Sequence, residues 1–278
     1  MNNIARQRQH YDEVATSVSE YAEFYSFLDK HMSYSCNLWF DNEMGSVAKN
    51  NAEATINKWE EYADILKLKE GMSVLVVGSG FGHMEKYLTK HYGVKVTSLN
   101  VSEEQFKYYT QDCEGVDFKL QSWEDFDARV EGDWKSFDVG ISEGVMVHQS
   151  DKKAFFKFFK DHTEKFLIRE MHLTEGTQLT KEECKNLNFT YGFSGSYCHT
   201  QESLDNIKDL GLKVTTSYWD IENYIKTQKG WLFEMDKNKK RMMEINEKAY
   251  KDRDFNFNLF LDGFFDGWFE MPLFLCEV

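Results

Sequence analysis

The pattern of apolar and polar positions changes at Gly71. Before it, apolar residues recur at helical spacing in residues 21–28 and again over residues 51–66. After it, MSVLVVG (72–78) is a short β-branched run that ends in glycine, which is typical of a buried parallel strand. The sequence therefore predicts a helical N-terminal segment followed by a domain that contains a β-sheet.

Further runs of strand length alternate with segments of helix length along the chain. The predicted strands are 72–78, 94–100, 116–121, 137–142, 165–173 and 212–219. Ser102 is placed to cap the helix after the second strand, and Thr200 to cap a helix that Gly211 ends. A helix over about 220–251 and a last strand in the tail complete the pattern. This alternation predicts an α/β fold with a mostly parallel, Rossmann-like sheet and helices on both faces.

The chain divides into four predicted parts, and no linker rich in proline, glycine or serine separates them. Residues 1–70 form an N-terminal helical segment that closes over a bound ligand. Residues 71–174 form the Rossmann-like core. Residues 175–252 form a cap and substrate-binding insertion with strand six, and residues 253–278 form a C-terminal strand that completes the sheet.

Composition narrows the range of partners. The net charge is −14, from 33 basic and 47 acidic residues. Such a chain repels polyanions, so neither a nucleic acid nor an anionic membrane surface is the expected partner. The 23 Phe, 14 Tyr and 7 Trp predict that some aromatic rings line an apolar or cation-binding pocket, beside those that build the core.

Cysteine usage and the termini predict a cytoplasmic protein. The five cysteines, an odd number without a CxxC pair, suggest neither a disulfide framework nor a zinc site; they are Cys36, Cys113, Cys184, Cys198 and Cys276. The N-terminus has no apolar signal core, and no apolar run approaches the ~20 residues that span a bilayer. The sequence does not define the oligomeric state.

The strongest chemical signal is VLVVGSGFG (74–82). It runs from a strand through Gly78-x-Gly80-x-Gly82 into a helix, and these glycines allow a tight turn and a close approach of a ligand to the backbone. The N-terminus of that helix can receive a carboxylate or a phosphate. Because residue 83 is histidine, the spacing differs from the dinucleotide G-x-G-x-x-G and favours the amino-acid end of S-adenosylmethionine.

Polar residues at the ends of the next two strands are further candidates for cofactor binding. Asn100 and Gln105 follow the second strand and are placed to hydrogen-bond a ribose, although Gln105 equally suits helix capping. Trp123 and Glu124 follow the third strand and are placed to flank an adenine and to accept from its amino group. The alternative for Trp123 is a packing role.

Several segments, in the same order, resemble one family. EFYSFLDKHMSYSCNLWF (23–40), LKEGMSVLVVGSGFG (68–82), VTSLNVSEEQ (96–105), QSWEDF (121–126) and ENYIKTQKGW (222–231) resemble motifs of the cyclopropane-fatty-acid-synthase and mycolic acid cyclopropane synthase family of methyltransferases. The resemblance runs over nearly the whole chain. It implies a class I methyltransferase fold with a seven-stranded sheet, and S-adenosyl-L-methionine as cofactor.

The resemblance also implies residue roles. The cofactor residues would be Tyr34 and Ser35 for the methionine end, Gly78, Gly80 and Gly82 for backbone approach, Asn100 and Gln105 for the ribose, and Trp123 and Glu124 for the adenine. In that family a bicarbonate ion serves as the base, and His172 and Tyr224 match the His and Tyr that hold it.

Two departures from the family motifs bear on chemistry. The family's Asp in the strand before the first glycine is Val76 here, which removes a carboxylate near the cofactor. The Phe-Glu-His motif after the fourth strand is Met146-Val147-His148. Because valine cannot accept a hydrogen bond, Val147 argues against bicarbonate-assisted cyclopropanation.

The chemistry of methyl transfer defines the candidate catalytic residues. Attack by an alkene carbon leaves a carbocation, which aromatic faces stabilise and from which a base must remove a proton. The candidate bases near strand ends are His148, His172, Glu143, Glu170 and Tyr224. For His148 and His172 the alternative is a hydrogen-bonded core residue.

Three hypotheses follow, in order of preference. The first is C-methylation of an alkene in an apolar substrate, such as an isoprenoid or acyl chain, which the aromatic surplus supports. The second is N-methylation of a small amine, which the acidic charge favours. The third is a non-catalytic homologue, motivated by Val76 and Val147.

Overall fold

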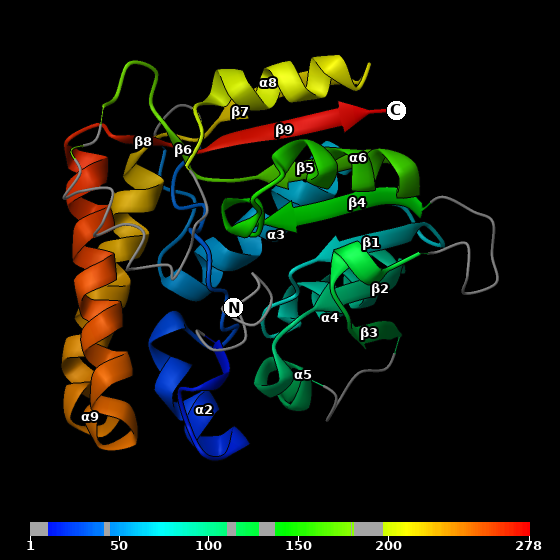
Figure 1. The fold of residues 1–278 in the computed structure, drawn as a ribbon. Coiled ribbons are helices and arrows are strands. Elements are labelled where there is room, and N and C mark those ends of the chain that lie inside the picture. Colours follow the sequence, from blue (N-terminus) through cyan, green and yellow to red (C-terminus); the bar gives the residue numbers. More distant parts are fainter. Residues whose placement is uncertain (1–10, 42–44, 110–114, 128–136, 179, 181–196) are drawn as a thin grey trace.

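The computed structural model describes residues 11–41, 45–109, 115–127, 137–178, 180 and 197–278. A seven-stranded sheet of order β3-β2-β1-β4-β5-β9-β7 forms the centre (Figure 1). Its strands are β1 (Ser73–Val77), β2 (Lys95–Asn100), β3 (Val116–Leu120), β4 (Phe137–Glu143), β5 (Thr163–Arg169), β7 (Lys213–Tyr218) and β9 (Pro272–Glu277). Strands β1 to β5 pair in parallel, and β9 runs antiparallel to β5 and β7. The predicted α/β class, parallel sheet and last antiparallel strand are confirmed.

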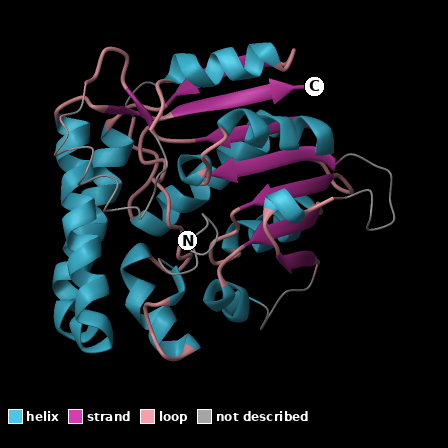
Figure 2. Ribbon diagram, viewed as in Figure 1, coloured by secondary structure: helices cyan, strands magenta, loops and turns pink. Residues whose placement is uncertain are grey.

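Alternating side chains of the strands build two cores, one on each face of the sheet. Helices cover both faces (Figure 2). Val74 and Val76 pack with α3 (Asn51–Leu66) and α4 (His83–Tyr92). Leu75 and Val77 pack on the opposite face with α6 (Lys152–His162) and α8 (Thr200–Asp209). Because successive side chains of a strand point to opposite faces, an unbroken apolar run such as VLVV requires a layer of helices on each side.

The remaining elements are short, apart from α9. They are α2 (Val18–Phe24), the 3₁₀ turns η1 (Tyr25–Leu28), η2 (Trp123–Asp125) and η3 (Met146–His148), α5 (Glu103–Tyr109), α9 (Glu222–Phe265) and the small ladder of β6 (His172–Leu173) and β8 (Phe269–Glu270). Non-helical backbone at Asn246 divides α9 into two helical segments. The ring centroids of Trp231 and Phe257, one from each segment, lie 5.2 Å apart, so the segments pack against each other.

The N-terminal segment is tied to α9 beside the carboxyl ends of the parallel strands (Figure 1). The Asn246 amide donates to the carbonyl oxygens of Glu13 and Val14, both at 3.1 Å. The buried Arg253 guanidinium donates to the Tyr25 hydroxyl at 2.7 Å. These contacts hold the N-terminal segment over the sheet edge at which ligands of doubly wound folds bind.

The structure corrects several predicted boundaries. Residues 253–265, assigned to the C-terminal strand, belong to α9, because Arg253, Phe257, Phe260 and Phe264 are buried at helical spacing. The strand predicted over 165–173 ends at Arg169, and a separate ladder begins at His172.

The prediction that Thr200 is the N-cap residue of α8 is wrong. The N-cap residue is His199, and Thr200 is the first helical residue, with its hydroxyl donating to Glu270. Residues 179 and 181–196 of the predicted cap lie outside the described residues, as does Cys113; Cys184 falls in the second of these ranges. Cys36, Cys198 and Cys276 are buried free thiols.

Candidate functional site

The glycine loop joins β1 to α4 at the carboxyl edge of the sheet. Gly78, Gly80 and Gly82 all have positive φ, at 90°, 54° and 72°. A Cβ on Gly78 would collide with the Val145 side chain, whereas a Cβ on Gly80 would meet nothing within 4 Å. Gly78 is therefore required for packing, and Gly80 faces open space in which a ligand can approach the backbone.

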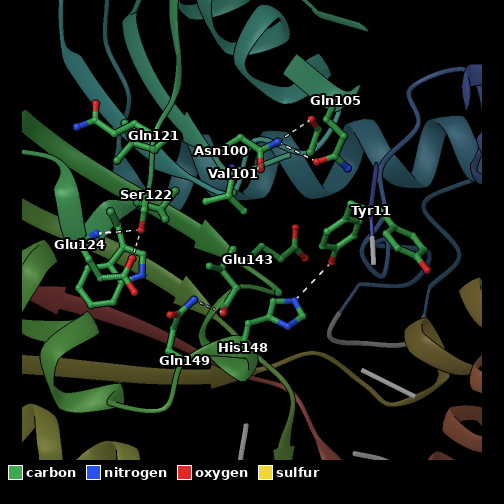
Figure 3. Close-up of a pocket in the computed structure, with 18 residues that line it drawn as sticks. Tyr11, Asn100, Val101, Gln105, Gln121, Ser122, Glu124, Glu143, His148 and Gln149 are labelled. Atoms are coloured by element: carbon green, nitrogen blue, oxygen red, sulfur yellow. Dashed lines mark hydrogen bonds between the residues drawn. The ribbon is translucent and has the colours of Figure 1, made fainter. Parts of the chain in front are cut away.

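One side of the loop opens onto a cavity of about 750 Å³, the Asn100 cavity, drawn in Figure 3. The Asn100 amide donates to Gln105 Oε1 at 2.8 Å, and Ser102 Oγ accepts the Gln105 N–H at 3.1 Å. Two roles were proposed for Gln105, in helix capping and in ribose binding. Its backbone N–H is capped by Ser102, and its side chain lines the Asn100 cavity. The paired amides present polar groups suited to ribose hydroxyls.

The far wall of the Asn100 cavity carries Trp123 and Glu124. Trp123 packs edge-on against Phe155 and Phe158, and its indole N–H is buried without a partner among the described residues. The Ser122 hydroxyl donates to Glu124 (Figure 3), and burial raises the pKa of the Glu124 carboxyl. An aromatic face beside a hydrogen-bond acceptor is an arrangement that suits an adenine ring.

The other side of the loop opens onto a second cavity of about 540 Å³, the glycine-loop cavity. Its lining includes Tyr34, Ser35, the three glycines, Val76, His31, His83 and Glu143. The Ser35 hydroxyl donates to Glu143 Oε2 at 2.8 Å, and Lys58 Nζ lies 3.0 Å from the same oxygen. Burial lowers the pKa of His83 to about 4, so this imidazole is neutral near pH 7.

A third cavity, the aromatic cavity, has a volume of about 830 Å³. Six aromatic side chains line it, namely Tyr11, Tyr34, Trp231, Phe257, Phe260 and Phe264. Glu143, Glu170 and His148 also reach it, whereas its described lining includes no lysine or arginine. Tyr34 and Glu143 line all three cavities, which therefore meet at these two residues.

Two of the candidate bases at the aromatic cavity differ in their proton affinity. Glu170 is buried, its Oε2 accepts the Val147 N–H and its Oε1 accepts the Met171 N–H, both at 2.9 Å. Burial raises the pKa of Glu170 to about 7 despite these bonds. Burial lowers the pKa of His148 to about 3, and its Nε2 lies 3.5 Å from the Tyr11 hydroxyl (Figure 3). Glu170 is therefore the stronger base of the two.

The structure does not bring His172 and Tyr224 together. His172 Nε2 is 2.7 Å from the Ser203 hydroxyl, and the Tyr224 hydroxyl accepts from Arg169. Both side chains are fully buried, and neither lines any of the three cavities. His172 is therefore a hydrogen-bonded core residue in the structure, which was the alternative to a catalytic role.

Sequence reasoning missed Tyr11, Lys58 and Arg169. Lys58 is fully buried on the apolar face of α3, and a lone lysine on that face was a readable signal. Arg169 stacks on the Trp219 indole and contacts Tyr62 and Tyr224, partners far apart in the sequence. Tyr11 reaches the site from the N-terminal segment; it lies in HYDEV (10–14), which also resembles the N-terminal segment of the family, but no role was predicted for it.

Comparison with known proteins gives the family. Residues 2–268 match the family described as "Mycolic acid cyclopropane synthetase". The chain belongs to this family. It is 34% identical over 131 residues to the cyclopropane-fatty-acyl-phospholipid synthase of Escherichia coli strain K12, in an alignment that covers 46% of this chain and 31% of that protein.

Two solved structures share the fold over the whole chain. The cyclopropane synthase MmaA2 from Mycobacterium tuberculosis superposes with a TM-score of 0.83 at 21% identity, covering 100% of this chain and 99% of that one. The mycolic acid cyclopropane synthase CmaA1, complexed with SAH and CTAB, gives a TM-score of 0.82 at 22% identity, with the same coverage. The class I methyltransferase fold predicted from the sequence is confirmed.

Family membership supports S-adenosyl-L-methionine as the cofactor, and the cavities fit this molecule. Every residue predicted to bind it lines the Asn100 cavity or the glycine-loop cavity. The buried Trp123 indole N–H and the buried Glu143 Oε1 have no hydrogen-bond partner among the described residues, so each can bond to a ligand. Across the same part of the chain, no helix is both long and apolar enough to cross a membrane.

Proposed function

We propose that the protein is an S-adenosyl-L-methionine-dependent methyltransferase that methylates an alkene carbon of an apolar substrate, an isoprenoid or an acyl chain. The observation that carries this proposal is the junction at Tyr34 and Glu143. There, the two cavities beside the glycine loop, which contain every residue predicted to bind the cofactor, meet a cavity lined by aromatic rings. A polar cofactor and an apolar substrate can therefore meet at one point.

We expect the Asn100 cavity and the glycine-loop cavity to hold different parts of the cofactor. The amides of Asn100 and Gln105, with Trp123 and Glu124, suit the adenosine, and the glycine loop with Ser35 suits the methionine end. S-adenosyl-L-methionine, when bound, supplies an electrophilic methyl group on a sulfonium. Tyr34 and Glu143, which line all three cavities, would hold the cofactor next to a substrate in the aromatic cavity.

The aromatic cavity supplies what an alkene needs to react. Methylation of one alkene carbon would leave positive charge on the other alkene carbon. The faces of Trp231, Phe257 and Phe260 suit such a cation, and the carboxylate of Glu170 lowers its energy further. Glu170 then takes a proton from the cation and restores a neutral product.

The residues present do not fit the bicarbonate ion that the family resemblance implies. Val147 is apolar, and His172 is bonded to Ser203 away from the cavities. The Glu170 carboxyl instead binds the backbone N–H of Val147, in the place where the motif lacks its glutamate. This contact supports a base that belongs to the protein.

N-methylation of a small amine is the second candidate. The aromatic cavity combines carboxylates with aromatic rings, and its described lining has no lysine or arginine. The same groups that stabilise a carbocation also attract an ammonium ion, and Glu170 can remove its proton before transfer.

A panel of substrates distinguishes C-methylation of an alkene from N-methylation of an amine. The protein is incubated with S-adenosyl-L-methionine that carries a deuterated methyl group and either olefinic isoprenoids and unsaturated acyl chains or small amines. Mass spectrometry then locates the label. Label on carbon supports the first proposal, label on nitrogen supports the second, and label on neither class with intact cofactor binding contradicts both.

A further inference from the structure

We propose that Glu143 binds the α-ammonium group of S-adenosyl-L-methionine and so anchors the cofactor, rather than acting as a base on the substrate. This inference rests on the proposed function, because it needs the cofactor to occupy the glycine-loop cavity.

The two carboxylate oxygens of Glu143 differ in their hydrogen bonds. It is the last residue of β4, and 11% of its side chain is exposed. Its Oε2 accepts from Ser35 at 2.8 Å and pairs with Lys58 Nζ at 3.0 Å. Its Oε1 is buried and has no hydrogen-bond partner among the described residues. A buried carboxylate oxygen without a donor is costly, and a cationic donor from a ligand removes that cost.

Lys58 holds this carboxylate in place and does not itself meet the ligand. Its side chain is fully buried, and its ammonium donates to Ser33 at 2.9 Å and to Ser35 while pairing with Glu143. These three partners match the three N–H groups of a lysine ammonium. Lys58 is thus a positioning residue that fixes Glu143 Oε2, while the Glu143 side chain lines the cavities.

The surroundings leave Glu143 as the sole counter-charge for an ammonium group there. Among the described residues that line the glycine-loop cavity, it is the one carboxylate, and the neighbouring strand contributes the apolar Val76. The cofactor's own carboxylate is served separately by the N-terminus of α4, which starts at His83 beside Gly82. The zwitterionic end of the cofactor therefore has one partner for each charge.

The position of Glu143 also separates its role from that of Glu170. Glu143 lines all three cavities and is fixed by an ion pair, whereas Glu170 lines the aromatic cavity and is held by two backbone N–H groups. The chain thus has one carboxylate, Glu143, at the glycine-loop cavity and another, Glu170, at the aromatic cavity. Val76 on β1 has no carboxylate, and Glu143 on the neighbouring strand β4 provides one instead.

Two ligands that differ in the amino-acid end test this assignment. S-adenosylhomocysteine carries the ammonium group, and 5′-methylthioadenosine lacks the whole amino-acid portion. Glu143→Gln is expected to weaken S-adenosylhomocysteine about tenfold in calorimetry, with methylthioadenosine unchanged, because a charged hydrogen bond is lost. Glu124→Gln, at the adenine end, is the matched control and is expected to weaken both ligands by the same factor.

Stability controls keep the result interpretable. Glu143→Gln leaves Lys58 buried without its counter-charge, so the double variant Lys58→Met/Glu143→Gln is measured alongside it, with thermal melting of each. The double variant is expected to show the same selective loss. Equal weakening of both ligands, or no weakening, in folded variants of a protein that binds S-adenosylhomocysteine overturns this inference alone. Failure of the wild type to bind S-adenosylhomocysteine overturns the proposed function as well.

Discussion

Oε2 of Glu170 accepts the backbone N–H of Val147 at 2.9 Å. This contact places a carboxyl group from the end of β5 directly at the turn after β4, where Val147 itself has no side-chain acceptor. We propose that Glu170, at the end of β5, supplies the carboxyl group that position 147 lacks. The contact explains how the protein can retain a base although its motif has lost the expected glutamate.

Glu170→Gln is expected to lower kcat by about 10²–10⁴-fold, because general base catalysis contributes about that much. Binding of S-adenosylhomocysteine is expected to stay unchanged, since Glu170 lines the aromatic cavity and neither of the two cavities beside the glycine loop. Steady-state kinetics and calorimetry on the same preparation separate the two effects.

The same residue sets the expected pH dependence. With its pKa raised to about 7, the Glu170 carboxyl is protonated and inactive as a base below that pH, so wild-type kcat/KM should rise through about pH 7 and then level off. The residual activity of Glu170→Gln should lack that inflection. An unchanged pH profile in the variant would assign the base to another group.

His172 is expected to be structural. His172→Phe removes the hydrogen bond to the buried Ser203 hydroxyl, which then keeps only the weaker contact with the Cys198 thiol, and should destabilise the fold by about 1–3 kcal/mol, while turnover of the folded enzyme persists. The double variant His172→Phe/Ser203→Ala should recover part of the loss, because the buried hydroxyl that has lost its imidazole partner is then removed. Loss of turnover with normal melting and cofactor binding would instead restore the catalytic role that the family resemblance implied.

Glu85 predicts a pH dependence of stability. It is fully buried on α4, where Ser98 donates to its Oε1 at 2.8 Å, and burial raises its pKa to about 7 from an ordinary value of 4.5. Between these two values the folded protein binds the proton that the unfolded chain releases. The stabilisation from the protonated form is complete below about pH 4.5 and is lost as pH rises through 7.

Glu85→Gln removes this titration. Relative to wild type, the variant should gain about 3 kcal/mol of unfolding free energy between pH 4.5 and pH 8. Urea unfolding across that range measures the difference. Glu202→Gln, an exposed change on α8, serves as the control and should show no comparable slope; a flat difference for Glu85→Gln would show that Glu85 is not buried as described.

Local signals in the sequence were sufficient for much of the fold and the cofactor cavities. The β-branched run before Gly78 and the glycine spacing predicted β1 and the loop, and Asn100 and Trp123 follow their strands as expected. These features depend on neighbours within a few residues. Gly78, Asn100 and Trp123 lie at a strand end or in a turn, where chain position alone limits where a residue can point.

The rest depended on contacts that no local pattern records. The Lys58–Glu143 pair joins α3 to β4, and the Tyr224–Arg169 contact joins α9 to β5. His172 lay near a predicted strand end, but the chain leaves the sheet after Arg169 and turns the imidazole toward Ser203. Side-chain direction after a strand ends is set by packing partners, which the sequence does not identify.

Calorimetry of S-adenosylhomocysteine binding to the wild type and to Gly80→Arg is the first measurement to make, because Gly80 lines both cavities beside the glycine loop and a Cβ at this position would meet no protein atom within 4 Å. We expect micromolar binding to the wild type, about −8 kcal/mol, and no binding to a variant that still melts cooperatively. A wild type that binds no S-adenosylhomocysteine, or a Gly80→Arg variant that binds it equally well, would contradict the assignment of these cavities to the cofactor.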